Sequence, residues 1–377
     1  MSDRYDAIVV GVGGMGSATA YHLASKGLET LGLERYDIPH AMGSSHGVTR
    51  IIRKAQYEHP AYVPLVRRAY EHWRELEEET GRELLYVTGG IDAGPPGSDI
   101  FEGSRRSCES HGIDYEVLSG GEVNERFPGY GFPADHRAIY QPEGGFVVPE
   151  QCIVAHVEAA QAEGAEIRAR EAVADFTPLS DGGVRVTSSK GTYEADRLVV
   201  TAGAWAKKLL PELAGQLVPE RQVLGWFQPT DPSLFDASNF PVFIHDSGNT
   251  HWYGFPKHDV PGFKFGKFNH LNETVDPDEM EREPRADDEE LLRSYARRFF
   301  PEGTGPTMQL ATCMFTNTPD EHFVLDRHPE HPQITVGAGF SGHGFKFASA
   351  IGEVLADLSV SGGTDLDIGL FSADRFE

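Results

Sequence analysis

The chain has 377 residues, of which 39% are hydrophobic and 10% aromatic, so it can bury real cores and is not expected to be disordered. Its length exceeds what one core usually accommodates, which predicts two domains. Asp and Glu outnumber Lys and Arg by 58 to 33, and the formal charge of −25 disfavours binding to nucleic acid or to anionic membranes. Two explanations stay open for this charge: a high-salt host, or an ordinary acidic enzyme.

Targeting signals and a disulfide framework are not apparent. No apolar run approaches the ~20 residues of a membrane-spanning helix, and the start, MSDRYDAIVVGVGG, lacks the apolar core of a signal peptide. Three cysteines, at positions 108, 152 and 313, are an odd number and do not suggest disulfide pairing. We therefore expect a soluble cytoplasmic protein without a membrane partner or a nucleic-acid partner.

The first predicted unit, residues 6–36, is a strand, a glycine-rich turn, a helix and a second strand that ends at Glu34. Gly11 permits a tight turn, Gly13 lets a pyrophosphate approach the backbone, and Gly16 allows close helix–strand packing. The helix N-terminus would face phosphates, and Glu34 would accept hydrogen bonds from ribose hydroxyls. A glycine-rich turn without a ligand is the alternative, and the motif alone does not separate FAD from NAD.

The rest of the chain alternates between helical, strand-like and aromatic β-rich sequence. Helices are predicted at 61–81, 150–163 and within 276–301, strands near 166–176 and 183–188, an antiparallel sheet over 217–270, and further strand–turn–helix units at 195–213 and 333–362. The strand–turn–helix units thus lie at the beginning, middle and end of the chain. We therefore expect the β-rich material to be inserted into a nucleotide-binding domain.

This interleaving favours FAD over NAD, by analogy with flavoproteins that bind FAD extended through the core. The predicted fold class is mixed α/β, with a Rossmann-like FAD-binding domain interleaved with an antiparallel-sheet substrate domain. The FAD-binding domain is assigned to residues 1–85, 146–215 and 320–377, and the substrate domain to residues 86–145 and 216–319.

Four motifs carry a family resemblance: AIVVGVGGMGSATAYHLASKG, GSSHGVTRIIRKA, CMFTNTPDEHFVLDRHPEH and GAGFSGHGFKFASAIGEVLADL. Together they closely resemble the monomeric sarcosine oxidase and N-methyltryptophan oxidase family, FAD-dependent amine oxidases of the D-amino acid oxidase superfamily. The likeness covers nearly the whole chain, and the last two motifs are specific to this family. It implies FAD, a small amino-acid substrate, dioxygen and a monomeric protein. No metal ligands are predicted.

The resemblance implies a covalent flavin. Cys313, in CMFT, matches the cysteine that family members join to the 8α carbon of the flavin through a thioether. Arg50 matches a nearby family arginine, a cation that would favour thiolate addition, and His46 matches a residue that lines the isoalloxazine. Taken alone, Cys313 would be an inert buried thiol, the interpretation that we keep for Cys108 and Cys152. Further cofactor contacts are implied for Gly14, Met15, Arg35, Ser44, Val173, Gly342, His343, Gly344, Phe345 and Lys346.

A pair of cations is implied for the substrate carboxylate. Arg53 and Lys346 match the family's carboxylate clamp, in which Arg supplies a planar fork and Lys a point charge. Lys346 lies at a predicted helix start, where a cation opposes the helix dipole unless an anion binds there. For Arg53 the alternative is a surface salt bridge.

The match is incomplete near the substrate amine. Lys264, in GFKFG, matches the lysine that promotes the reaction with dioxygen, with a solvent-facing strand lysine as the alternative, and Tyr253 matches an active-site tyrosine. Family members place a His shortly after this lysine, but the segment here is about one residue longer. Either Asn269 or His270 is expected there, and side-chain alternation favours Asn269. A family tyrosine is Phe315 here, so the departures affect the identity of the amine more than the reaction class.

The predicted reaction is FAD-dependent oxidation of a secondary amino acid, such as sarcosine or another N-methyl amino acid, by hydride transfer to flavin N5. Dioxygen would be reduced to hydrogen peroxide, and imine hydrolysis would complete the demethylation. N-methyltryptophan and cyclic imino acids are alternative substrates. Alternative functions are a flavin-dependent dehydrogenase with another electron acceptor, an NAD(P)-dependent reductase, and a non-catalytic flavin- or amine-binding protein.

Overall fold

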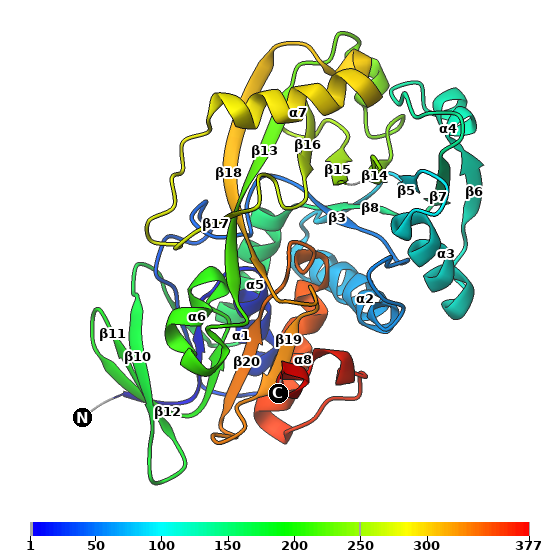
Figure 1. Ribbon diagram of the computed structural model, residues 1–377. Coiled ribbons are helices and arrows are strands. Elements are labelled where there is room, and N and C mark those ends of the chain that lie inside the picture. Colours follow the sequence, from blue (N-terminus) through cyan, green and yellow to red (C-terminus); the bar gives the residue numbers. More distant parts are fainter. Residues whose placement is uncertain (1–2, 249, 377) are drawn as a thin grey trace.

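Two large β-sheets organise the molecule, shown in Figure 1 as a computed structural model that describes residues 3–248 and 250–376. One sheet has mainly parallel strands with helices packed against it, and the other is mainly antiparallel. The predicted mixed α/β fold class is therefore confirmed. The domain boundaries given above stay predictions.

The first sheet has eight strands in the order β10-β11-β12-β1-β2-β9, with β20 beside β12 and β19 beside β20. Its strands are β1 (Asp3–Val10), β2 (Thr30–Leu33), β9 (Glu166–Arg168), β10 (Val173–Pro178), β11 (Val184–Ser188), β12 (Thr192–Val200), β19 (Val324–Arg327) and β20 (Ile334–Ala338). The neighbours β12-β1-β2-β9 are parallel, as is β12 with β20. Strands from three distant parts of the sequence thus share one sheet, because parallel strands need crossover connections.

Small residues let the helices beside this sheet pack closely against one another. Helix α1 (Gly14–Ser25), with the sequence GMGSATAYHLAS, contacts both α5 (Pro149–Ala162) and α8 (Ala348–Ser361), and α8 also contacts α2 (Tyr62–Thr80). A Cβ placed on Gly352 of α8 would lie 2.5 Å from the Cβ of Ala18 of α1. The predicted helices at 61–81 and 150–163 are α2 and α5.

The second sheet has nine strands in the order β17-β13-β16-β15-β14-β5-β7-β6, with β18 on the other edge of β13. They are β5 (Gly90–Gly94), β6 (Glu116–Ser119), β7 (Arg137–Gln141), β13 (Val218–Phe227), β14 (Val242–Asp246), β15 (His251–Phe255), β16 (Phe263–Lys267), β17 (Glu273–Thr274) and β18 (Thr307–Asn317). Helix α7 (Ala286–Phe299) lies across this sheet at the top of Figure 1. A phenylalanine-rich core, including Phe227, Phe243, Phe263 and Phe300, fills the space beneath it.

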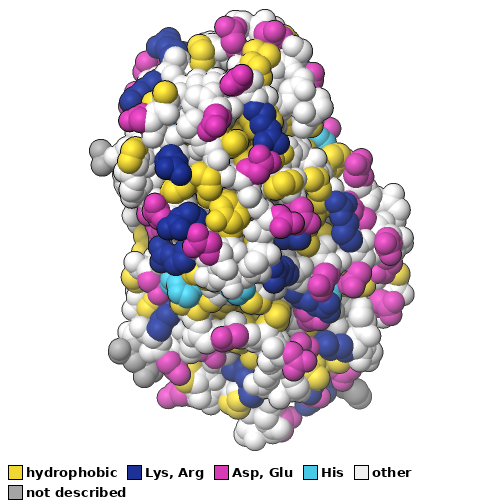
Figure 2. Space-filling view, turned by 90° about the vertical axis from the view of Figure 1, so that its right-hand side faces the viewer, with side chains coloured by type: hydrophobic (Ala, Val, Ile, Leu, Met, Phe, Trp, Pro, Cys, Tyr) yellow, Lys and Arg dark blue, Asp and Glu magenta, His cyan; other side chains and the backbone are white. Residues whose placement is uncertain are grey.

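The remaining elements complete the surface. A small antiparallel sheet pairs β3 (Arg50–Ile52) and β4 (Leu85–Val87) with β8 (Gly145–Val147), and the other helices are α3 (Asp99–His111), α4 (Gly120–Arg126) and α6 (Ala206–Leu209). On the face shown in Figure 2, acidic and basic side chains are interspersed. Within the described part of the chain, no helix has both the length and the apolar character that crossing a membrane requires.

The α1–α8 contact gives a stability prediction. In Gly352→Ala the new methyl group would also lie 2.6 Å from the backbone carbon of Ala18, which the two helices can relieve only by moving apart. We expect the free energy of unfolding to fall by about 1–3 kcal/mol. Urea denaturation followed by circular dichroism, at matched cofactor content, measures this change.

Gly121→Ala in α4 is the matched control, because the nearest atom to its Cβ would be 3.9 Å away. That helical position should gain up to about 1 kcal/mol from the better propensity of Ala. Equal stability of Gly352→Ala and the unchanged protein would show that the helices do not meet as closely as described.

Candidate active site

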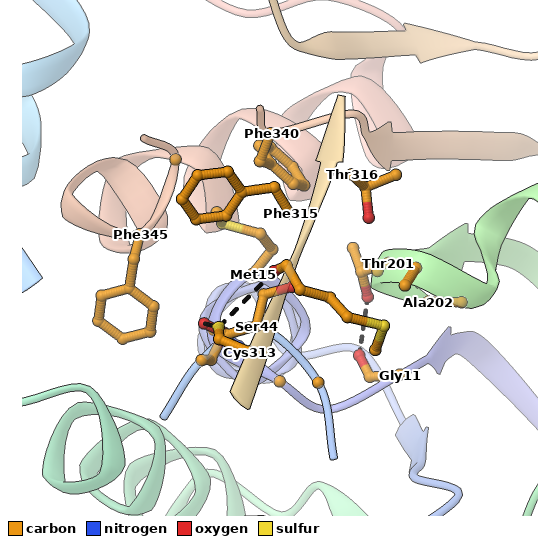
Figure 3. A pocket seen from close by; sticks show the side chains of 18 of the residues that line it. Gly11, Met15, Ser44, Thr201, Ala202, Cys313, Phe315, Thr316, Phe340 and Phe345 are labelled. Carbon is orange, nitrogen blue, oxygen red and sulfur yellow. Dashed lines mark hydrogen bonds between the residues drawn. The ribbon is translucent and has the colours of Figure 1, made fainter. Parts of the chain in front are cut away.

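A cavity of about 350 Å³ lies between the two sheets. It extends from the glycine-rich turn after β1 to residues of β14, β15 and β18, and Figure 3 shows part of its lining. Predicted site residues that line it are Gly11, Gly13, Gly14, Met15, Glu34, Arg35, Ser44, Arg50, Val173, Tyr253, Cys313, Gly342, His343, Gly344, Phe345 and Lys346. Gly16, His46, Arg53, Lys264, Asn269 and His270 do not belong to this lining.

The glycine turn is packed tightly on one side and open on the other. Gly11 has φ +88°, and a Cβ there would lie 2.7 Å from the carbonyl oxygen of Thr201. A Cβ on Gly16 would lie 1.8 Å from the carbonyl oxygen of Gly11, which itself accepts a hydrogen bond of 2.8 Å from the Thr201 hydroxyl (Figure 3). Around Gly13 the nearest atom would be 4.0 Å away, so backbone and the N-terminus of α1 remain accessible from the cavity.

Glu34 is buried at the end of β2 beside this turn. Its two carboxylate oxygens accept hydrogen bonds from the backbone N–H groups of Val12 and Tyr36, at 2.8 and 2.9 Å. The neighbouring Arg35 places its guanidinium carbon 5.3 and 5.4 Å from the ring centroids of Tyr36 and Trp205. Because each oxygen of a carboxylate accepts more than one hydrogen bond, Glu34 can still bind hydroxyl groups.

Cys313 has a cation as its neighbour. The Arg50 guanidinium lies 3.8 Å from its sulfur and donates a 2.8 Å hydrogen bond to the carbonyl of Ser44, which lies next to Cys313 in Figure 3. Burial raises the pKa of the Cys313 thiol, and the Arg50 charge opposes that rise. Burial therefore favours the neutral thiol, but the sulfur lies where a thiolate, once formed, would be stabilised by Arg50.

His46 lies behind this part of the cavity. Burial, together with the charges of Arg50 and Lys264, lowers the pKa of His46 to about 3, so its imidazole is neutral. Its Nε2 atom has no hydrogen-bond partner among the described residues.

Two polar groups in the cavity are free to bind a ligand. The buried Thr316 hydroxyl has no partner within the described part of the chain, and neither a hydrogen bond nor an ion pair joins the Lys346 ammonium to any described residue. Burial lowers the pKa of Lys346 to about 7, although the carboxylate of Glu58 opposes the shift. Buried polar groups are normally satisfied, so these two indicate a ligand with polar atoms. With the open glycine turn, they fit an elongated dinucleotide and an anionic substrate.

Arg53 is buried and not part of a surface salt bridge. Its Nη1 donates to the carbonyl of Ala55 at 2.6 Å and to the side chain of Gln56 at 2.9 Å. Its Nε lies 3.1 Å from Asp92, and its Nη2 donates to Glu58 at 3.4 Å. Every nitrogen of the guanidinium therefore already faces an acceptor, whereas Lys346 does not.

Lys264 is also buried, with 2% of its surface exposed, so the alternative of a solvent-facing strand lysine is wrong. Its ammonium donates to the carbonyls of Gly47 and Thr49, at 2.6 and 2.7 Å, and to the Thr49 hydroxyl at 2.8 Å. It lies 4.1 Å from the ring centroid of Phe255, which lines the cavity. Burial lowers the pKa of Lys264 well below its ordinary value.

Neither Asn269 nor His270 faces the cavity. The His270 imidazole is buried 3.0 Å from Asp288, and burial lowers its pKa to about 4. The Asn269 amide accepts a hydrogen bond from Asn317 at 3.2 Å. Their predicted roles near the substrate amine stay predictions, without support from this placement.

Phe268 lines the cavity instead, and sequence reasoning did not assign it a role. Side chains on a strand alternate between faces, so Lys264, Gly266 and Phe268 share one face of β16 and its extension. Gly266 pairs with Tyr253 of β15, and a Cβ at Gly266 would lie 2.5 Å from the Tyr253 hydroxyl. Counting in steps of two from Lys264 would have identified Phe268.

A separate cluster of Asp99, Asp246 and His251 brings three possible metal ligands within 4.8 Å of one another. None of the three lines the cavity. His251 already lies 3.4 Å from Asp99, an ion pair that explains the cluster without a metal.

Residues 6–358 match the family model described as FAD dependent oxidoreductase. The monomeric sarcosine oxidase of Streptomyces avermitilis is 42% identical over 380 residues, covering 100% of this chain and 98% of the relative. The N-methyl-L-tryptophan oxidase of Yersinia pestis (strain Pestoides F) is 35% identical and covers 99% of both chains.

Solved structures give the same fold. NikD, an amino acid oxidase essential for nikkomycin biosynthesis, superposes in its open form with a TM-score of 0.85 at 26% identity, over 98% of both chains. L-Proline dehydrogenase from P. horikoshii also has a TM-score of 0.85, at 23% identity, over 100% of this chain and 98% of that one. Because the family model matches nearly the whole sequence, the chain belongs to the FAD-dependent oxidoreductases, and FAD rather than NAD(P) is its cofactor.

Proposed function

We propose that this protein oxidises a secondary amino acid, such as an N-methyl amino acid, and reduces dioxygen to hydrogen peroxide. The observation that carries the proposal is one cavity that joins the dinucleotide turn, a cation-flanked cysteine and the unpaired Lys346. Full-length relatives named monomeric sarcosine oxidase and N-methyl-L-tryptophan oxidase, at 42% and 35% identity, support it. Hydrolysis of the product imine would release formaldehyde from an N-methyl substrate.

FAD, when bound, supplies the acceptor for the hydride from the carbon next to nitrogen and passes the electrons to dioxygen. The turn at Gly11–Gly16 and Glu34 would hold its diphosphate and ribose, with Arg50 and Cys313 beside its ring system. The apolar walls around Tyr253 would exclude water from the reacting end. A covalent bond from Cys313 and a monomeric state are parts of the proposal.

Lys346 is the residue that would receive the substrate carboxylate first. Its ammonium faces the cavity unpaired, whereas the Arg53 guanidinium does not belong to the cavity lining and already contacts Ala55, Gln56, Asp92 and Glu58. Burial strengthens a charge pair here because the local dielectric is low. In the free site, Arg53 would mainly balance the charges of Asp92 and Glu58.

A pH dependence of carboxylate binding follows. Burial lowers the pKa of Lys346 to about 7, so the ammonium that attracts an anion is present below that pH and lost above it. The Kd of a carboxylate without an amine, such as propionate, should rise up to about tenfold per pH unit above pH 7. Calorimetric titration of the holoenzyme from pH 6 to pH 9 measures this.

Lys346→Met should weaken propionate binding and abolish its pH dependence. Lys207→Met, a change outside the cavity lining, is the matched control and should keep both. An unchanged pH profile in Lys346→Met would assign carboxylate binding to another group.

Covalent attachment is tested by denaturation. After acid precipitation the yellow colour should stay with the polypeptide, whereas Cys313→Ser should release the flavin into the supernatant. Arg50→Met should slow attachment more than Arg50→Lys, because only the lysine keeps a cation near the sulfur, now 3.8 Å from Arg50. If the wild-type protein releases its flavin, Cys313 is not the attachment site and is a buried core thiol. The proposed amine oxidation would be unaffected by that result.

The electron acceptor is tested together with the reaction. The wild-type protein should release peroxide from N-methyl amino acids, and Lys264→Met should lower oxygen consumption about 10²–10³-fold, because a fixed N–H donor in a buried site stabilises charge that develops on dioxygen. Anaerobic flavin bleaching by the same amine should persist in the variant. Lys257→Met, at a lysine that pairs with Asp236, is the control.

Peroxide from none of the secondary amino acids would contradict the proposed function. Undiminished oxygen consumption in Lys264→Met would remove Lys264 from the reaction with dioxygen. Turnover only with a quinone or another carrier would favour the dehydrogenase alternative.

A further inference from the structure

Three aromatic rings line one end of the cavity: Tyr253 of β15, Phe268 directly after β16, and Phe315 of β18. The ring centroids of Tyr253 and Phe268 lie 5.0 Å apart in an edge-on arrangement, and those of Phe268 and Phe315 lie 6.0 Å apart. Leu224 and Ile244 line the cavity and belong to the same hydrophobic cluster as Tyr253. This set of three rings is called the aromatic wall below.

The aromatic wall carries one polar atom, the Tyr253 hydroxyl. Burial raises the pKa of Tyr253, so the phenol stays neutral. Phe268 and Phe315 have neither a hydroxyl nor a titratable nitrogen. Among the described residues that line the cavity, Glu34 is the only carboxylate, and it lies at the dinucleotide turn. No anion therefore lines the aromatic end, and a cationic substrate side chain would be left unpaired there.

Two consequences follow for a bound secondary amine. Apolar surroundings disfavour its ammonium form, so the wall favours the neutral amine, which has the lone pair that hydride loss requires. The apolar surroundings also favour substrates with apolar substituents, because each CH₂ group buried on binding raises the affinity about fourfold. Sarcosine has no side chain with which to use this surface.

We propose that Phe268 and Phe315 determine specificity, making the site selective for secondary amino acids with an apolar side chain over sarcosine. This inference rests on the proposed function. The carboxylate would be held by Lys346, as above, and the side chain would lie against the aromatic wall. Polar or cationic side chains would be disfavoured, because the Tyr253 hydroxyl is the one polar atom of the wall and, among the described lining residues, no carboxylate lies at this end to pair with them.

Steady-state kinetics of the holoenzyme test the selectivity. The wild-type kcat/KM should be at least about tenfold higher for N-methyl-L-leucine than for sarcosine, since several CH₂ or CH₃ groups become buried. Phe268→His and Phe315→Tyr should each lower that ratio severalfold by adding polar atoms to the wall. Phe176→Tyr, a change in β10 outside the cavity lining, should leave it unchanged.

Binding without turnover provides an independent readout. Calorimetry should show 4-methylpentanoate binding at least about tenfold more tightly than acetate, and Phe268→His should reduce that difference. Phe315→Tyr keeps the test available if Phe268→His does not fold. Flavin content and circular dichroism report folding.

The outcomes separate the two proposals. Peroxide from sarcosine at equal or higher kcat/KM, with a ratio that neither variant changes, would overturn the specificity inference while the proposed function stands. Peroxide from no secondary amino acid would overturn the proposed function itself. A high wild-type ratio that falls in both variants supports the inference.

Discussion

The antiparallel pairing of β13 with β18 is the interaction on which the site depends. It extends from Val218 opposite Asn317 to Phe227 opposite Thr307, so that β18 reaches from the second sheet to the vicinity of the glycine turn (Figure 1). Cys313 and Phe315 lie on this stretch and both line the cavity. The pairing therefore places Cys313 and Phe315, two residues of the second sheet, in the same cavity as the dinucleotide turn that follows β1 of the first sheet.

Charge in the cavity is arranged differently from charge on the surface. The chain as a whole has a formal charge of −25, yet the unpaired charge facing the substrate end is the cation of Lys346. Arg53 is a second cation close enough to affect the charge of Lys346. It forms ion pairs with Asp92 and Glu58, and the Glu58 carboxylate also attracts the Lys346 ammonium. A small anion therefore meets a local attraction within an acidic protein, and the strength of that attraction depends on the protonation of one lysine.

Sequence patterns predicted the parts of the site whose chemistry is local. The glycine turn and Glu34 follow from a short motif, because neighbouring residues impose their geometry. The place of Cys313 beside Arg50, which is 263 residues away in the sequence, was instead implied by the family resemblance. The partners of Arg53 were not predicted, since Asp92 comes from β5 and becomes a neighbour only through sheet pairing. Phe268 was not predicted, because the segment after Lys264 is about one residue longer than in the family, and the family histidine position was therefore assigned to Asn269 or His270. The helices and strands between residues 86 and 145 were likewise not predicted, although α3 there is amphipathic, with Ile100, Ser104 and Cys108 on its buried face.

A crystal structure of the holoenzyme with 4-methylpentanoate tests the account most directly. We expect the carboxylate within hydrogen-bonding distance of the Lys346 ammonium, the alkyl chain against Tyr253, Phe268 and Phe315, and Arg53 still paired with Asp92. A carboxylate bound away from Lys346, or an alkyl chain directed away from the aromatic wall, would contradict it.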